Sequence, residues 1–169
     1  MSEIVKDFLG KTLEIPGDRL YLAGEGLWIK EQEGPERVAV GLTEPSLLMS
    51  GPVRQVEELA APGSRVRVGQ EVMLALTAKI KYLVAPLEGE ISFPPEMEPL
   101  VEGLAGDPYG TALFFLAGAD PASGRLCDAA GYARSLRDSD GSRNPTGAVG
   151  PGSSTCKAIY MGLGAQKLE

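Results

Sequence analysis

The chain has 169 residues, of which 43% are hydrophobic, and this is enough apolar material for one packed domain with additional segments. Charged residues make up 23% of the chain and the formal net charge is −7, which argues against binding to nucleic acid or to an anionic membrane surface. Histidine is absent, which excludes Ser-His-Asp and Cys-His catalysis and metal sites built on histidine.

The sequence indicates a cytoplasmic protein. No apolar run approaches the roughly 20 residues of a membrane-spanning helix. Residues 1–11 carry acidic side chains and lack the apolar core of a signal peptide. The two cysteines, Cys127 and Cys156, lack CxxC spacing and are expected to be free thiols, with a disulfide between them left open.

The predicted elements are mostly short strands, and the first segment is the exception. Residues 2–9 have the apolar spacing of a short amphipathic helix that ends at Gly10. Residues 13–21 form an extended arm broken at Pro16-Gly17. Strands are then predicted over residues 26–31, 36–42, 53–59, 65–68, 72–77, 81–84, 89–93 and 112–116.

Two short helices are predicted between these strands. Thr43 is a suitable N-cap for residues 44–49, where Pro45 is tolerated in the first turn and Gly51 ends the helix. A second helix is expected to start at Pro94-Pro95 and to run to about Gly103.

The C-terminal part of the chain has a different composition. Residues 120–152 are rich in glycine and proline, and we expect a linker or disorder there, with at most one helix near residues 126–136. Residues 156–163 are apolar enough to pack on the core or on a partner. Many short strands with frequent turns predict an all-β fold, a sandwich or flattened barrel of two antiparallel sheets with short helices and an irregular C-terminal extension.

The most informative segment is the predicted hairpin of residues 72–84. Lys79 lies at its turn, and a second turn follows at residues 86–89. A lysine held at a hairpin tip has the geometry for a covalently attached, swinging cofactor. The acidic residues are scattered and no phosphate-binding loop is present, so the sequence indicates a carrier without catalytic residues or a metal site, and not an enzyme.

Several motifs occur in a specific order along the chain. They are Ile15-Pro16-Gly17-Asp18 with Tyr21 and Trp28, Val40-Gly41-Leu42-Thr43, Leu59 to Pro62-Gly63, Pro86-Leu87-Glu88-Gly89-Glu90 and Asp107-Pro108-Tyr109-Gly110. Over about residues 15–116 the chain therefore resembles the glycine cleavage system H protein family. The resemblance implies a lipoyl carrier domain of the barrel-sandwich hybrid type over residues 15–118. Residues 1–14 are then an N-terminal helix or arm, and residues 119–169 a partly disordered extension.

The family carries lipoate as an amide on a lysine at the hairpin tip. Lys79 lies ten residues after Gly69 and sixteen after Gly63, which matches the family spacing. Lys79 is therefore the candidate attachment site, and Lys81 is the second candidate. Such an arm would turn diffusion between active sites into a tethered search at raised effective concentration.

The hairpin also departs from the family pattern. The interval from Lys79 to Pro86 is one residue shorter than in the family, and an ungapped reading back from Pro86 places Ala78 at the lysine position. We expect a one-residue deletion in the returning strand and a hairpin tip that differs from the family, for example through a bulge. Leu76 stands where the family has an acid three residues before the lysine, and Gly26-Leu27 replaces a histidine-acid pair.

The resemblance implies a role in glycine catabolism. The carrier would shuttle an aminomethyl group between a pyridoxal-phosphate decarboxylase and a tetrahydrofolate-dependent aminomethyltransferase. A dihydrolipoyl dehydrogenase would reoxidise the arm, and a lipoate-attaching enzyme would load it. The alternative is an interaction or regulatory module that kept the fold and lost lipoylation. A biotin carrier is a third idea, in which Ala78 and Ile80 replace the usual flanking methionines.

Overall fold

The chain folds mainly into short antiparallel strands, and the all-β prediction is confirmed. The computed structural model describes residues 2–33 and 37–143. The strands of this part are β1 (Glu3–Phe8), β2 (Lys11–Ile15), β3 (Leu20–Leu22), β4 (Leu27–Glu31), β5 (Arg37–Leu42), β6 (Gln55–Glu58), β7 (Arg65–Val66), β8 (Glu71–Leu76), β9 (Ile80–Val84), β10 (Gly89–Ser92) and β11 (Phe114–Ala117). The helices are α1 (Glu44–Ser50), α2 (Glu98–Gly106) and α3 (Ala129–Arg137), with 3-10 turns η1 (Ala23–Glu25), η2 (Pro108–Gly110) and η3 (Pro121–Ser123).

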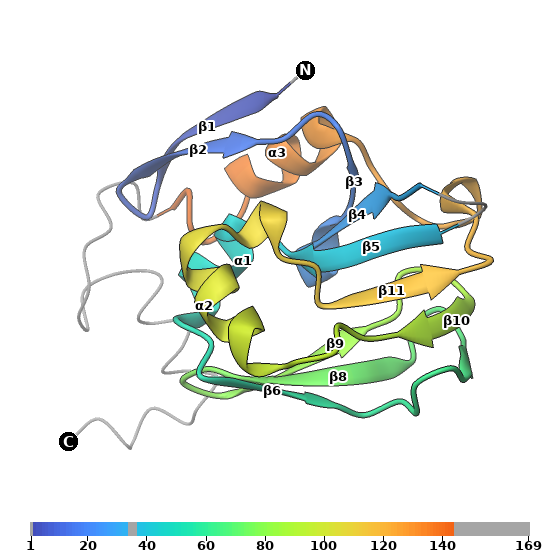
Figure 1. Cartoon of the computed structure of the whole chain (residues 1–169). Helices are drawn as coiled ribbons and strands as arrows, with labels where there is room; N and C mark the ends of the chain where they lie inside the picture. Colours follow the sequence, from blue (N-terminus) through green and yellow to red (C-terminus); the bar gives the residue numbers. More distant parts are fainter. Residues whose placement is uncertain (1, 34–36, 144–169) are drawn as a thin grey trace.

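Two main sheets form a sandwich. The order β3-β4-β5-β11-β10-β7 makes one sheet and β6-β8-β9 the other, and β1 and β2 form a separate hairpin. Figure 1 shows β8 and β6 as a layer below β5 and β11, with α1 and α2 at one end and the β1–β2 hairpin and α3 above. The large sheet is therefore covered on both faces.

Strand β5 shows this double coverage in its sequence. Val38 and Val40 belong to the core cluster between the two sheets, whereas Ala39 belongs to a second cluster with β1, β2 and α3. Side chains alternate between the two faces of a strand, and both faces of this sheet are covered. All three side chains are therefore buried. In this second cluster the small Ala39 side chain is buried together with aromatic side chains.

The predicted N-terminal helix is wrong, because residues 3–8 form strand β1 and pair with β2. The spacing of Val5 and Phe8 resembles a helical face, but both side chains are buried in the second cluster and the register shifts between them. Asp7 and Leu9 have positive φ values of 57° and 50°, which no α-helix tolerates. The extended arm predicted over residues 13–21 did not identify β2 as a separate strand.

The single helix predicted near residues 126–136 is confirmed as α3, but it is packed and not part of a linker. Asp128 caps it by accepting a hydrogen bond from the Gly131 N–H. The Tyr132 ring stacks on Tyr21 at 4.8 Å between ring centroids. The predicted disorder of residues 144–152 and the apolar segment 156–163 lie outside the described residues.

The short helix after β5 forms as predicted. Thr43 is its N-cap and accepts a hydrogen bond from the Ser46 N–H, and Gly51 ends it with φ of 85°. Helix α2 starts at Glu98, later than the predicted Pro94. In residues 2–33 and 37–143, no helix combines the length and the hydrophobicity needed to cross a bilayer.

We predict that Tyr132→Phe lowers the free energy of unfolding by about 1–2 kcal/mol. The Tyr132 hydroxyl lies 2.6 Å from Thr43 Oγ1, and both residues are buried, so the variant removes this buried hydrogen bond and leaves Thr43 Oγ1 with the Ser46 N–H alone. Denaturant unfolding monitored by tryptophan fluorescence measures the change.

The matched control is Tyr82→Phe, because Tyr82 is 48% exposed. Its stability should stay within about 0.5 kcal/mol of the wild type. If Tyr132→Phe were as stable as this control, α3 would not be anchored through the hydroxyl pair.

Candidate functional site

The β8–β9 hairpin ends in a three-residue loop that contains Lys79. Leu76 pairs with Ile80, so the loop consists of Thr77, Ala78 and Lys79. Ala78 stands at the middle of the loop, and Lys79 is its last residue before β9. Both are exposed. The predicted turn is therefore where the sequence placed it, with the lysine on the returning side of the apex.

The one-residue irregularity lies in β8 and not at the tip. Glu71 pairs with Val84, but Met73 pairs with Leu83, so Val72 is an extra residue on β8. The bulge explains how the interval from Lys79 to Pro86 is one residue short while the tip keeps regular pairing. The spacing predicts a change at the hairpin tip, and that position is wrong, because the register shifts between Glu71 and Met73 instead.

Thr77 closes the loop across Ala78. Its N–H donates to the Lys79 carbonyl oxygen at 2.8 Å, and its Oγ1 donates to the same oxygen at 2.9 Å. The Lys79 N–H donates to Thr77 Oγ1 at 3.2 Å. Sequence reasoning missed Thr77, although a hydroxyl residue two positions before a turn lysine is a recognisable signal for such a local hydrogen bond.

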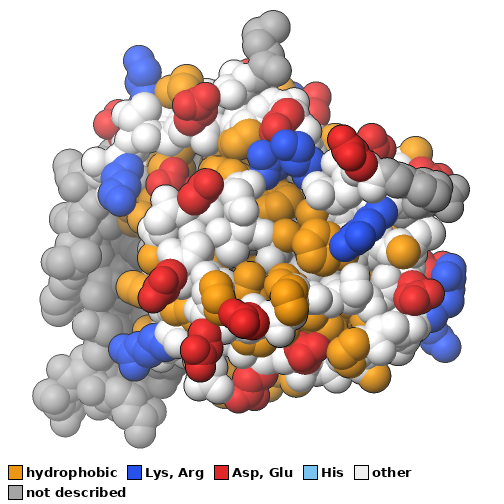
Figure 2. Space-filling model, viewed as in Figure 1, with side chains coloured by type: hydrophobic (Ala, Val, Ile, Leu, Met, Phe, Trp, Pro, Cys, Tyr) orange, Lys and Arg blue, Asp and Glu red, His pale blue; other side chains and the backbone are white. Residues whose placement is uncertain are grey.

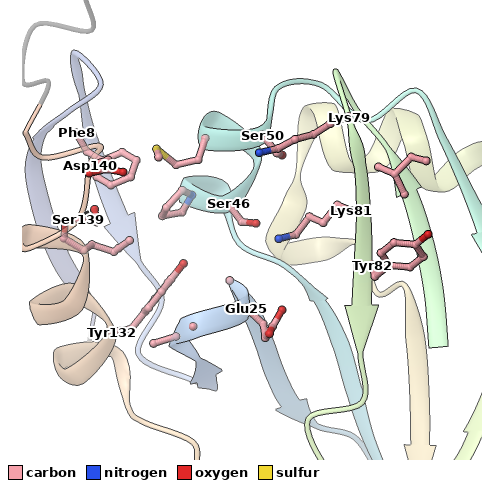
Figure 3. Close-up of a pocket in the computed structure, with 17 residues that line it drawn as sticks. Phe8, Glu25, Ser46, Ser50, Lys79, Lys81, Tyr82, Tyr132, Ser139 and Asp140 are labelled. Atoms are coloured by element: carbon pink, nitrogen blue, oxygen red, sulfur yellow. Dashed lines mark hydrogen bonds between the residues drawn. The ribbon is translucent and has the colours of Figure 1, made fainter. Parts of the chain in front are cut away.

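Lys79 and Lys81 point to the same side of the hairpin, toward α1. Figure 3 shows Lys79 near Ser50, and Lys81 directed toward Ser46 and Glu25. Ile80 and Tyr82 alternate with them, and each is about half exposed. Within the described chain, the Lys79 side chain has no ion pair or side-chain hydrogen bond.

The two lysines line a groove of about 690 Å³. Its other walls come from η1, from α1 and from the end of α3 with Phe8 of β1 (Figure 3). The apolar lining includes Phe8, Met49 and Leu136, and the hydroxyl groups come from Ser46, Ser50, Tyr132 and Ser139. The groove therefore joins segments that are more than 100 positions apart in the sequence.

Burial lowers the pKa of Lys81, and the positive charge of Lys79 lowers it further, while the carboxylate of Glu25 opposes both effects. Because the folded protein binds the Lys81 proton less tightly than the unfolded chain does, the contribution of Lys81 to the free energy of unfolding is greatest above the ordinary lysine pKa. It is lost as the pH falls through the lowered pKa. Lys81 is thus a half-buried cation beside the exposed Lys79.

The motif residues near the tryptophan form the framework behind this groove. The Trp28 Nε1–H donates to the Pro108 carbonyl oxygen at 3.0 Å, and Gly41 leaves the space that the Trp28 ring fills. The Arg19 guanidinium lies 4.7 Å from the Trp28 ring centroid and donates to the Tyr109 carbonyl oxygen at 2.7 Å. The Tyr109 hydroxyl accepts from the Glu44 N–H, which ties this cluster to the start of α1.

The remaining candidate groups do not form a second site. Among the described residues, no three His, Cys, Asp or Glu side chains come together to hold a metal ion. Cys127 has no disulfide partner among the described residues, and burial raises the pKa of its thiol. Cys156 lies outside the described residues, so the open disulfide alternative stays a hypothesis.

Comparison with known proteins supports the fold. No protein-family model and no curated protein sequence matches the chain. Solved structures do match, and one is a glycine cleavage system H protein from Mycobacterium marinum. It is 29% identical over 72% of this chain and 98% of its own length, with a TM-score of 0.60. This chain therefore has an H-protein-like fold.

The charges in the groove predict opposite shifts of the Lys81 pKa in two variants. Lys79→Gln should raise the pKa of Lys81, because a neighbouring positive charge is removed. Glu25→Gln should lower it further, because the stabilising carboxylate is removed. Side-chain ¹⁵N and ¹³C NMR titration of lysine measures both, with Lys81→Arg used to assign the signal.

A control is Glu3→Gln at the other end of β1 from Phe8, because Glu3 does not line the groove and the variant should leave the Lys81 pKa unchanged. Shifts of the same sign in the two groove variants would contradict this description of the electrostatics.

Proposed function

We propose that the protein is a non-catalytic lipoyl carrier and that Lys79 is its attachment site. The observation that carries the proposal is an exposed hairpin-loop lysine beside a groove, in a chain with an H-protein-like fold. The ordered sequence motifs support the same family, because the Trp28 and Tyr109 motifs build the framework behind α1.

The residues around Lys79 fit a lipoyl group. Its short aliphatic chain and sulfur ring are apolar, and Phe8, Met49 and Leu136 give the groove an apolar lining within which hydroxyl groups are interspersed. Lys79 would hold the group through an amide bond. When bound, lipoate supplies a cyclic disulfide that can be reduced to two thiols and can carry the transferred group as a thioether or thioester.

The chain's own residues set the charge around the attachment point. Amide formation removes the positive charge of Lys79. Lys81 is then the positively charged side chain that the hairpin contributes to the groove. The effect of Lys79 on the pKa of Lys81 then disappears. Glu25 lies on the opposite side of the groove and favours the protonated form of Lys81 (Figure 3).

The proposed partners are the enzymes of a glycine cleavage-type system. They comprise a decarboxylase, an aminomethyltransferase and a dihydrolipoyl dehydrogenase, together with a lipoate-attaching enzyme. The net charge of −7 favours docking on basic partner surfaces. On the face drawn in Figure 2, acidic side chains are scattered among hydrophobic ones, and the few basic side chains stand apart. We place this function in the cytoplasm.

The functional unit extends beyond the predicted carrier domain of residues 15–118. Phe8 and Tyr132 lie on either side of that range, and both line the groove. A carrier unit that includes β1 and α3 therefore accounts for the site better than the domain boundaries predicted from the sequence.

We predict a single lipoyl group on the wild-type protein after expression with lipoate and a lipoate-attaching enzyme. Lys79→Arg should abolish the mass increase, because the arginine side chain cannot form the amide, and Lys81→Arg should retain it. Intact-mass spectrometry and peptide mapping measure both outcomes.

Lys81→Arg is the matched control, since it changes a neighbouring lysine on the same face and keeps its charge. An unmodified wild-type protein, or a modification that persists in Lys79→Arg, would refute Lys79 as the attachment site. A mass increase equal to that of biotin would favour the biotin carrier instead.

The second candidate function is an interaction module without lipoylation. Leu76 at the place of the family's acid favours it, because Leu76 and Ile80 form an apolar pair directly opposite each other on the hairpin. In that case the wild-type mass stays unmodified, and partner proteins are captured equally well by the wild type and by Lys79→Arg.

A further inference from the structure

Thr77 is an unusual residue within the described chain because it is a buried polar side chain at an exposed loop. It is 5% exposed, and Thr43 is the other buried polar residue of this part. Buried hydroxyl groups in proteins are almost always hydrogen-bonded. Thr43 meets this need through α1 and Tyr132, whereas the hydroxyl of Thr77 bonds the main chain of Lys79.

The Thr77 hydroxyl engages both polar groups of the Lys79 main chain. Oγ1 donates to the Lys79 carbonyl oxygen at 2.9 Å and accepts from the Lys79 N–H at 3.2 Å. The Thr77 N–H adds a third bond to the same carbonyl at 2.8 Å. These bonds join Thr77 to Lys79, on either side of Ala78. They therefore hold the two ends of the loop and leave its middle residue, Ala78, exposed.

This arrangement orders the main chain from which the Lys79 side chain leaves the hairpin. Ordering a residue costs conformational entropy, and a free loop lysine would have to be ordered when an enzyme binds it. Here the hydrogen bonds of Thr77 order the Lys79 main chain before binding. The side chain then lies on the groove side with Lys81 (Figure 3). Preorganisation of this kind lowers the cost of productive binding.

We propose that Thr77 is a positioning residue that presents Lys79 for acylation. The inference rests on the proposed function, because it concerns the same lysine. In the acylation, the Lys79 amine nitrogen attacks the carbonyl carbon of an activated lipoyl ester or mixed anhydride. An amide C–N bond forms, the bond from the carbonyl to the activating group breaks, and the amine loses one proton to solvent or to the attaching enzyme. Thr77 makes no contact with the reacting atoms and acts through the Lys79 main chain.

The experiment compares Thr77→Val with Thr77→Ser in the full chain. Valine keeps the β-branched shape and removes the hydroxyl, whereas serine keeps the hydroxyl. Initial rates of lipoyl transfer from lipoate and ATP by a purified lipoate-attaching enzyme are measured against the concentration of the unmodified protein. Thr77→Val should lower kcat/KM about tenfold, mainly through a higher KM for the protein, and Thr77→Ser should stay within about twofold of the wild type.

A matched control is Thr12→Val, which removes a hydroxyl from an exposed residue of β2 and should leave kcat/KM unchanged. A readout that does not depend on the enzyme is amide hydrogen exchange at Lys79. It should become faster in Thr77→Val and stay at the wild-type rate in Thr77→Ser. If Thr77→Val fails to fold by circular dichroism, Thr77→Ala replaces it in both measurements.

The outcomes distinguish a failure of this inference from a failure of the proposed function. If the wild type is lipoylated on Lys79 and Thr77→Val is modified at the wild-type rate, the positioning role is overturned and the carrier function stands. If kcat/KM falls equally in Thr77→Val and Thr77→Ser, the hydroxyl does not position the lysine. If the wild type is not modified on Lys79, the carrier function and the positioning role fall together.

Discussion

The buried contact between Thr43 and Tyr132 holds together the parts of the molecule that form the groove. Thr43 follows β5 directly and starts α1, where its Oγ1 accepts from the Ser46 N–H and lies 2.6 Å from the Tyr132 hydroxyl. One side chain therefore connects the central sheet, the helix that lines the groove and the helix near the end of the described chain. Because both hydroxyl groups are buried, water cannot replace either partner, and α1 stays between the hairpin and α3.

The residues that produce the family resemblance mostly build this framework and do not perform chemistry. Arg19 lies over the rings of Trp28 and Tyr109, Gly41 leaves space for the Trp28 ring, and the Tyr109 hydroxyl accepts from the Glu44 N–H at the start of α1. The proposed modification depends instead on a few atoms of the loop, namely the Lys79 amine and the hydrogen bonds that Thr77 makes with its main chain. Similarity in the framework and loading of the lysine are thus separate properties.

Much of the fold could be predicted because its signals are local. Alternating side chains and turn residues indicated most strands within a few positions, and Thr43 with Gly51 marked both ends of α1. The N-terminal segment was misassigned because Val5 and Phe8 have a spacing that suits either a helix or a bulged strand, and only the pairing with β2 distinguishes the two. The packing of α3 was missed since a glycine-rich composition does not reveal that Tyr132 stacks on Tyr21.

The sequence alone determined that Lys79 lies in a turn between two strands of an all-β carrier-like fold, because turn formation and strand alternation depend on neighbouring residues. Only the tertiary structure decided which way that lysine points and what it faces. The main chain from which it leaves is held by the pairing of Leu76 with Ile80 and by the hydrogen bonds of Thr77. Its surroundings combine Phe8 of β1 with Tyr132 of α3, which sheet packing and buried hydrogen bonds bring together from distant parts of the chain.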